Sequence, residues 1–247
     1  MNKPLLHCLL SFGFVLSLSL LNASLNVSAA PGIEWKNTHL TPPEEFKIRN
    51  SVAADDVNSL STTPQKISVS FEDWQENGTD RVNLHTDYHA LFPLPIESVI
   101  AILLDIENED SVYPNMTFTK DLTPKRDWNE GHYQEVVNSF SFLGIGAKYH
   151  YIVYRVPTWH QDGTFTSHWA LVHSIDDKYE TLYGSWYVKE FSLEGKPHTY
   201  VRNYVETEII DPPPFLKTIR EIFGRSTVRR FFDALYEAAR EHRAARQ

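Results

Sequence analysis

The chain has 247 residues, of which 42% are hydrophobic and 13% aromatic, so it suits one folded domain with an extension rather than a disordered chain. Its 32 acidic residues outnumber 23 basic ones and give a net charge of −9, which argues against nucleic acid or an anionic membrane surface as a partner. A single cysteine, Cys8, excludes an internal disulfide.

The first 29 residues have the pattern of a secretory signal peptide. An apolar run over residues 5–25 follows Lys3 and ends in the small-residue stretch Val27–Ala30. We expect cleavage after Ala29, which removes Lys3, leaves 22 basic against 32 acidic residues and brings the net charge to −10. Cys8 is removed too, so the mature chain has no thiol nucleophile and no thiolate metal ligand.

This leader predicts a secreted protein, periplasmic if the source is bacterial. The alternative is a retained membrane anchor, because the apolar run approaches the length of a membrane span. No later segment is apolar enough over a sufficient length to cross a bilayer. The mature chain is therefore expected to have no integral membrane span.

Residues 30–65 form an extension rich in Pro, Ser, Thr, Asn and Asp. This composition is typical of connecting segments, although residues 43–50 allow one short helix. Two interpretations remain open: a tether, or a strap that packs on the domain.

The folded domain is expected to begin with a β-hairpin followed by a short helix. Residues 67–71 alternate apolar and polar side chains, Asn77-Gly78 is a strong turn signal, and Arg81–Phe92 continues as the second strand. Prolines end this strand. The next segment, Ile96–Leu104, carries its apolar residues on one helical face, which predicts the helix.

About six further strands are expected to follow as an antiparallel meander. Each is bounded by turn residues, such as Asp162-Gly163 and Glu194-Gly195. The predicted strands cover residues 116–122, 132–142, 147–156, 165–175, 182–193 and 198–210.

The last segment, residues 211–243, predicts a long amphipathic helix. Asp211 could cap its first amides, and the prolines that follow fit only a first turn. Gly224 allows a kink or a break. The helical stripe consists of Phe215, Ile219, Ile222, Phe223, Val228, Phe231, Phe232, Leu235, Tyr236 and Ala239. Such a stripe must cover something, so we expect an α+β fold with a curved antiparallel sheet wrapped around this helix.

This order of elements resembles the helix-grip fold of the START-like (SRPBCC) superfamily, which includes Bet v 1-like and polyketide cyclase/dehydrase-like proteins. The likeness rests on the helix Ile96–Leu104, which leads through Asp105 to Tyr113-Pro114, and on Glu206–Leu216, which is similar to the usual last strand, proline turn and grip helix. It covers Ile67–Arg240 and implies a domain over residues 66–243. No catalytic signature contributes, so function taken from it is an analogy.

The resemblance implies a cavity between sheet and helix, lined by alternate residues of each strand. Strand alternation and the helical stripe then give the expected lining: Trp169, Leu171, Leu182, Trp186, Val188, Val201, Val205, Phe215, Ile219 and Phe231. The glycine-bearing turn Phe142–Ala147 is either a lip of the entrance or a hairpin that tucks in. Alternation does not decide which face of Tyr149–Val156 points inward, because both faces are apolar.

Several polar residues are candidates for a metal or catalytic site. His85 and His89 share a strand face but stand roughly 13 Å apart, too far to hold one metal ion. His150, His168 and His173 lack zinc-site spacing, and Glu206 with Glu208 fits a solvated edge better than an acid–base pair. No nucleophile, phosphate-loop or dinucleotide motif is present. The sequence therefore assigns no catalytic residue, no metal ligand and no cofactor.

The function expected from this evidence is a secreted START-like domain that binds a hydrophobic small molecule or lipid in an internal cavity without covalent chemistry. One alternative is a cyclase- or hydrolase-type enzyme acting on an apolar or polyketide-like substrate. The other is an interaction module with a collapsed cavity. The expected partner is an apolar small molecule or lipid and not nucleic acid, and the sequence does not predict an oligomeric state.

Overall fold

The computed structural model describes residues 60, 65–123, 131–142 and 145–246. Side chains are described at these positions except 65, 141–142, 145 and 214–223. All of these residues lie in one compact unit, Leu40–Gln247. Within this part of the chain, no helix combines the length and the hydrophobicity that a membrane span needs.

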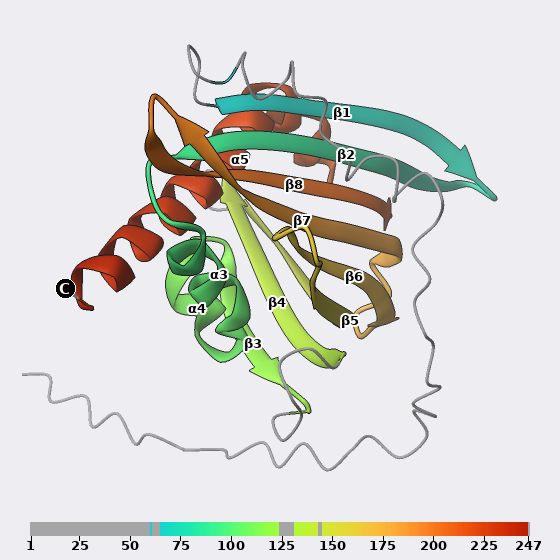
Figure 1. The fold of residues 1–247 in the computed structure, drawn as a ribbon. Coiled ribbons are helices and arrows are strands. Elements are labelled where there is room, and N and C mark those ends of the chain that lie inside the picture. Colours follow the sequence, from blue (N-terminus) through green and yellow to red (C-terminus); the bar gives the residue numbers. More distant parts are fainter. Residues whose placement is uncertain (1–59, 61–64, 124–130, 143–144, 247) are drawn as a thin grey trace, which may run out of the picture. The chain divides into compact units, whose positions relative to one another are not determined.

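The domain is built on one open sheet of eight antiparallel strands in the order β1-β2-β8-β7-β6-β5-β4-β3 (Figure 1). The strands are β1 Gln65–Glu76, β2 Thr79–Phe92, β3 Met116–Asp121, β4 His132–Phe142, β5 Ile145–Trp159, β6 Phe165–Ser174, β7 Tyr179–Leu193 and β8 Lys196–Ile210. The predicted hairpin and meander are therefore confirmed. The chain returns from β8 to β2, so the last strand lies beside the first hairpin.

The β1–β2 turn shows why the sequence specifies a hairpin. Asn77 and Gly78 have φ values of 52° and 82°, and two successive positive φ values fit the twist of a tight hairpin. Asparagine and glycine tolerate this conformation best. The strands leaving the turn pair from Glu76 with Thr79 to Gln65 with Ala90.

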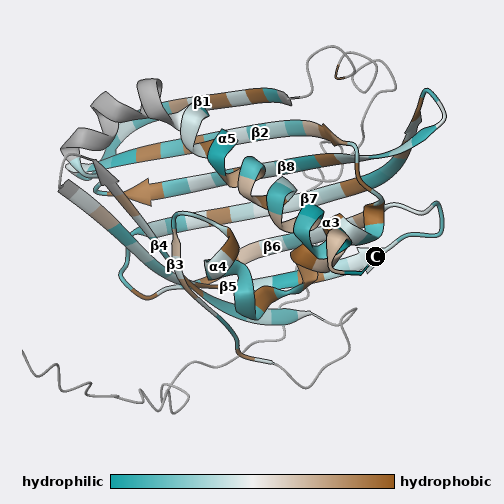
Figure 2. Cartoon of the chain, turned by 90° about the vertical axis from the view of Figure 1, so that its left-hand side faces the viewer, coloured by the Kyte–Doolittle hydropathy of each residue, from teal (hydrophilic) through white to brown (hydrophobic). Residues whose placement is uncertain are grey.

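Three helices lie on the same face of the sheet (Figure 2). They are α3 Ile96–Leu104, α4 Glu109–Val112 and α5 Pro214–Ala244, and a 3₁₀ turn, η1 Ile106–Asn108, separates the first two. The predicted short helix agrees with α3. Neither η1 nor α4 was predicted, because three or four helical residues are too few to show a period.

The long helix differs from the prediction at its start and at its middle. Asp211 does not cap it: the N-cap position is Pro213, and Asp211 has a φ of 47° in the turn that ends β8. Nor does α5 break at Gly224. A Cβ there would lie 3.4 Å from Val69 Cγ1 and 3.5 Å from Phe71 Cζ, which are ordinary van der Waals contacts, so α5 lies against β1 at this position without requiring a glycine.

We call the face of the sheet that carries the helices the inner face, and the opposite one the outer face. The contacts of Phe232 on α5 identify the inner face. Its ring stacks on Tyr88 of β2 with centroids 3.2 Å apart and meets Trp186 of β7 edge-on at 5.4 Å, so both of these side chains point to the inner face. The pairing register extends the assignment to the neighbouring strands. As expected from alternation, Leu182, Trp186, Val188, Val201, Val205 and Trp169 share the inner face, while Arg202, Glu206 and Glu208 are on the outer face.

The main core lies where α3 and the second half of α5 cover the sheet. Phe232 and Leu235 are fully buried there, beside Leu103 of α3 and Val201 of β8. We call this group the helix-covered cluster. Its buried members are Tyr88, Ala90, Phe92, Leu94, Ile96, Val99, Ile100, Leu103, Tyr113, Phe165, Trp186, Val188, Val201, Phe232, Leu235 and Ala239.

Candidate functional site on the inner face of the sheet

A second apolar group occupies the inner face beyond the helix-covered cluster. All eight strands contribute to it, and no described helix side chain does. We call it the strand cluster. Its buried members are Val82, Val136, Ala147, Tyr149, Tyr151, Val153, Leu182 and Ile209, and its partly buried members are Phe71, Met116, Phe140, Trp169, Leu171, Tyr179 and Val205.

The partly buried members make this region unlike a closed core. Seven apolar or aromatic side chains on the inner face keep some contact with solvent. Such residues include Leu171 on β6 and Val205 on β8, in the middle of the strand order. Apolar side chains that remain accessible in a group are typical of surfaces that bind something.

Trp169 lies at the border between the two clusters and contacts both. It pairs directly with Gly184 across β6 and β7, and a Cβ on that glycine would lie 1.9 Å from Trp169 Cζ2. The indole therefore lies over the backbone of β7, in the space that a larger residue would fill. Trp186 follows at a centroid distance of 6.4 Å.

Three tyrosines form the aromatic part of the strand cluster. Tyr179 stacks on Tyr149 at 5.1 Å and meets Tyr151 edge-on at 5.1 Å. Asn138 Nδ2 donates to Tyr151 Oη at 2.7 Å, whereas the buried Tyr149 hydroxyl has no hydrogen-bond partner among the described residues. Burial raises the pKa of Tyr149 to about 12, and burial also raises the pKa values of Tyr151 and Tyr179. These phenols stay protonated and can donate a hydrogen bond at neutral pH.

A buried ion pair joins the helices to the sheet next to this region. Arg155 Nη1 of β5 donates to Glu109 Oε1 of α4 at 2.6 Å, and each residue is only 4% exposed. Arg155 Nε donates to Ser167 Oγ at 2.8 Å, and its Nη2 donates to the carbonyl of Leu103 at 2.5 Å. Gln134 Nε2 donates to the second oxygen of Glu109 at 2.5 Å. Both charges are thus paired and hydrogen-bonded, as burial requires.

No family model and no curated protein matches the sequence. Among solved structures, the STAR-related lipid transfer protein of Xanthomonas axonopodis has a TM-score of 0.50 and 13% identity, and the match covers 70% of this chain and 98% of that one. Human StAR-related lipid transfer protein 5 has a TM-score of 0.51 and 12% identity, and the match covers 79% and 96%. The chain has a START-like fold. The helix-grip architecture expected from the sequence is therefore confirmed at the level of the fold.

The predicted lining residues of this START-like domain fall into both clusters. Trp169, Leu171, Leu182 and Val205 belong to the strand cluster, while Trp186, Val188, Val201 and Phe231 pack with the helices in the helix-covered cluster. The side chains of Phe215 and Ile219, and residues 143–144 of the turn Phe142–Ala147, lie outside the described part. That these residues line a ligand cavity stays a prediction.

Sequence reasoning missed Arg155, Glu109 and Gly184. Arg155 lies in a strand that is apolar on both faces. Gly184 is an inner-face position of β7 that lacks the apolar side chain expected from the alternation. The glycine was a usable signal, because an interior glycine in a strand often marks a close approach. The ion pair could not be predicted from a local pattern, since Glu109 and Arg155 are separated by 46 positions.

Several of the polar candidates from the sequence have structural partners on the outer face. His89 Nε2 lies 3.1 Å from Asp87 Oδ1, Tyr204 donates to Glu206 at 2.8 Å, and Glu208 pairs with Arg81 at 3.2 Å. Burial alone would raise the pKa of Asp87, but hydrogen bonds from His89 and Arg202 hold it well below its usual range. In the described ranges, no three His, Cys, Asp or Glu side chains are placed to hold a metal ion.

Proposed function

We propose that this START-like domain binds a hydrophobic small molecule or lipid between the strand cluster and α5. The observation that carries the proposal is the group of partly exposed apolar side chains on the inner face, which includes Phe140, Leu171 and Val205. Covering this surface with an apolar ligand would gain about 25 cal/mol for each Å² removed from water. Both reported fold relatives are named lipid transfer proteins, which supports the same ligand class.

The tyrosines of the strand cluster indicate that the proposed ligand carries a polar group. Tyr149 carries a buried hydroxyl without a partner among the described residues, and such a donor costs roughly 1–3 kcal/mol when it stays unpaired. A ligand oxygen in reach of this hydroxyl would remove that cost. We therefore favour an amphiphile or an oxygen-bearing apolar molecule over a plain hydrocarbon.

We propose that binding involves no covalent step. The buried acid at the start of α4, Glu109, accepts a hydrogen bond from Arg155 at one oxygen and from Gln134 at the other, so neither oxygen is positioned as a free base. An enzyme would need a protonatable group in contact with the ligand. Turnover of a bound compound by the purified protein would favour the cyclase or hydrolase alternative.

We also propose that the mature chain is secreted, or periplasmic if the source is bacterial. This rests on the apolar leader, whose small-residue end suits signal peptidase. Sequencing the N-terminus of protein from its own host tests it: Ala30 as the first residue supports secretion, and a chain that still begins at Met1 rejects it.

A titration against fatty acids, phospholipids, sterols and flat aromatic compounds tests the binding proposal. Trp169 borders the strand cluster, so we expect a saturable change in tryptophan emission with at least one class. Tyr149→Phe should weaken binding of an oxygen-bearing ligand more than that of its deoxy analogue, whereas Tyr151→Phe is the matched control because its hydroxyl already bonds Asn138. If no class binds, the interaction module with a collapsed cavity becomes the better account.

A further inference from the structure

The outer face carries its own apolar patch, remote from the inner face and its ligand. Leu91 of β2 and Tyr200 of β8 are buried there, and the half-buried Tyr187, Phe191 and Leu193 of β7 pack against them. The patch spans the end of the β7–β8 hairpin, since Leu193 pairs with Lys196 at the turn. We call these five residues the outer patch. Helices α3, α4 and α5 all lie on the other side of the sheet (Figure 2).

Leu60 lies on the outer patch. It is 2% exposed and forms one buried cluster with Leu91 and Tyr200. Leu60 precedes the sheet, so it belongs to the extension that the sequence leaves open as a tether or a strap. A leucine this deeply buried contributes on the order of 2 kcal/mol of hydrophobic stabilisation in a typical protein, which a solvated tether would not gain.

A polar network makes the floor of the outer patch rigid. Tyr200 Oη lies 2.6 Å from His89 Nδ1, and His89 Nε2 lies 3.1 Å from Asp87 Oδ1. Arg202 holds the same carboxylate with two hydrogen bonds of 2.8 and 2.7 Å. His89, Tyr200 and Arg202 are buried and Asp87 is half-buried, so the patch above them needs a cover that keeps water out.

Chain connectivity indicates that this cover comes from the same molecule. Leu60 stands five residues before Gln65, and this spacing spans at most about 18 Å of extended chain. Gln65 pairs with Ala90, the neighbour of Leu91, so β1 begins beside the patch. A residue tethered this closely has a high effective concentration and outcompetes a second copy of the chain.

We propose that the N-terminal segment is a strap, anchored by Leu60 in the outer patch, that fastens the β7–β8 hairpin to β2 within one molecule. The patch is an intramolecular docking site for a leucine-bearing segment. The strap therefore extends the folded domain at least to residue 60, and it holds the side of the sheet that the helices leave uncovered. This inference is independent of the proposed ligand.

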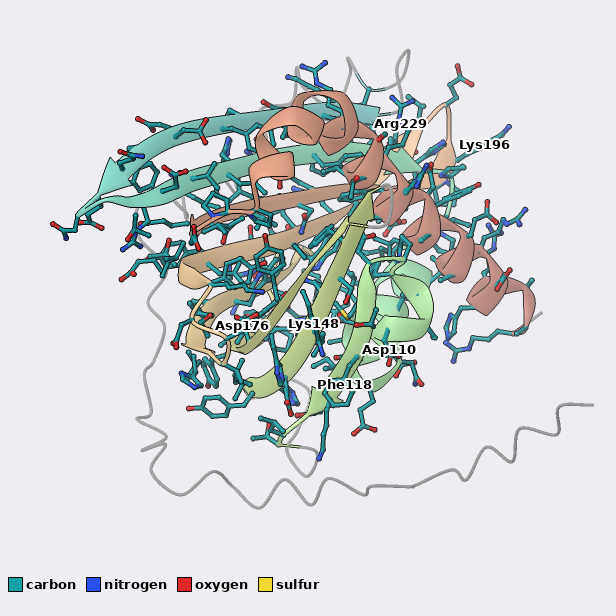
Figure 3. The ribbon with its side chains drawn as sticks, turned by 180° about the vertical axis from the view of Figure 1, so that it is seen from behind. Asp110, Phe118, Lys148, Asp176, Lys196 and Arg229 are labelled. Carbon is teal, nitrogen blue, oxygen red and sulfur yellow. The ribbon has the colours of Figure 1, made fainter. Side chains whose placement is uncertain are left out.

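Disulfide trapping in the full chain tests the proposal. Cys8 is replaced by serine, and Leu60→Cys is combined separately with Leu91→Cys and with Leu193→Cys. Leu60→Cys with Lys148→Cys is the control, because Lys148 on β5 lies well away from the β7–β8 hairpin that carries Lys196 (Figure 3). Mild oxidation with diamide, which takes up the two thiol hydrogens, should give a fast-migrating monomer in at least one patch pair and none in the control.

Two results would overturn the strap. A disulfide-linked dimer would mean that the segment comes from a second copy, and the absence of any patch disulfide would mean that Leu60 does not dock there. Hydrogen exchange gives a second readout that does not depend on cysteines. Leu60→Asp should speed amide exchange in Phe191 and Leu193 while Leu60→Met leaves it unchanged; equal exchange in both variants also rejects the proposal.

Discussion

The helix-covered cluster and the strand cluster are built from the same strands by the same alternation, yet they differ in what covers them. In the first, α3 and the second half of α5 bury Phe232, Leu235 and Val201 completely. In the second, described helix side chains contribute nothing and about half of the members stay partly exposed. The comparison shows that one sheet face is closed core at one end and partly exposed at the other, where we propose that the ligand binds. Substitutions should therefore cost stability in one cluster and ligand affinity in the other.

The largest effect on stability is expected from Phe232→Ala. This ring is fully buried between Tyr88 and Trp186, so its loss leaves a cavity and should cost about 4 kcal/mol. Leu171→Ala in the strand cluster should cost only about 1 kcal/mol, because the side chain is already partly exposed. Urea unfolding of both variants measures the contrast. Equal losses would mean that the two clusters are one core.

Breaking the ion pair at the border of the clusters should have the next largest effect. Arg155→Met leaves Glu109 buried without its cation, which should cost about 3 kcal/mol. The double variant Glu109→Leu with Arg155→Met should recover much of this loss, because no charge remains buried. A double-mutant cycle by denaturant unfolding checks both. A single variant as stable as wild type would show that the pair does not hold α4 on β5.

A loss of stability at acidic pH should come from His168, on the outer face of β6. Burial, with a smaller contribution from His160, lowers the pKa of His168 from 6.5 to about 4. The folded state then binds a proton less readily than the unfolded state, so this residue's contribution is present above about pH 6.5 and is lost as the pH falls toward 4. The loss should be roughly 3 kcal/mol, because one pKa unit corresponds to about 1.4 kcal/mol.

The variant His168→Asn isolates that contribution. Its unfolding free energy should fall less than that of wild type between pH 7 and pH 4, while ligand binding at neutral pH stays the same, because His168 faces outward opposite Ser185. Parallel pH profiles for the two proteins would contradict the assignment.

A small effect on stability, but a clear one on binding, is expected from Gly184→Ala. The added methyl group would overlap Trp169, which must swing off β7, at a cost of about 1–2 kcal/mol. Because Trp169 borders the strand cluster, its emission and the affinity for an apolar probe should both change. Gly195→Ala, in the β7–β8 turn, is a control for glycine loss away from the inner face. An unchanged probe affinity in Gly184→Ala would place the ligand elsewhere.

Local signals in the sequence were sufficient for the elements but not for the site. The Asn77-Gly78 turn and strand alternation predicted the hairpin and the inner-face residues of β7 and β8. The start of α5 was missed because Asp211 adopts a positive φ in the turn before it. Which inner-face residues the helices cover depends on the path of α3 and α5, and Leu60 docks through contacts distant in sequence, so neither follows from a local pattern.

The central claim is that the ligand contacts the strand cluster, and photolabelling tests it most directly. A diazirine-bearing probe of the class that binds in the titration is irradiated with the protein, and labelled peptides are mapped by mass spectrometry. We predict labels on Leu171, Leu182 or Val205 and their strands, competed by unlabelled ligand and reduced in Leu171→Asp. Labels confined to the helix-covered cluster or to the outer face would contradict the account.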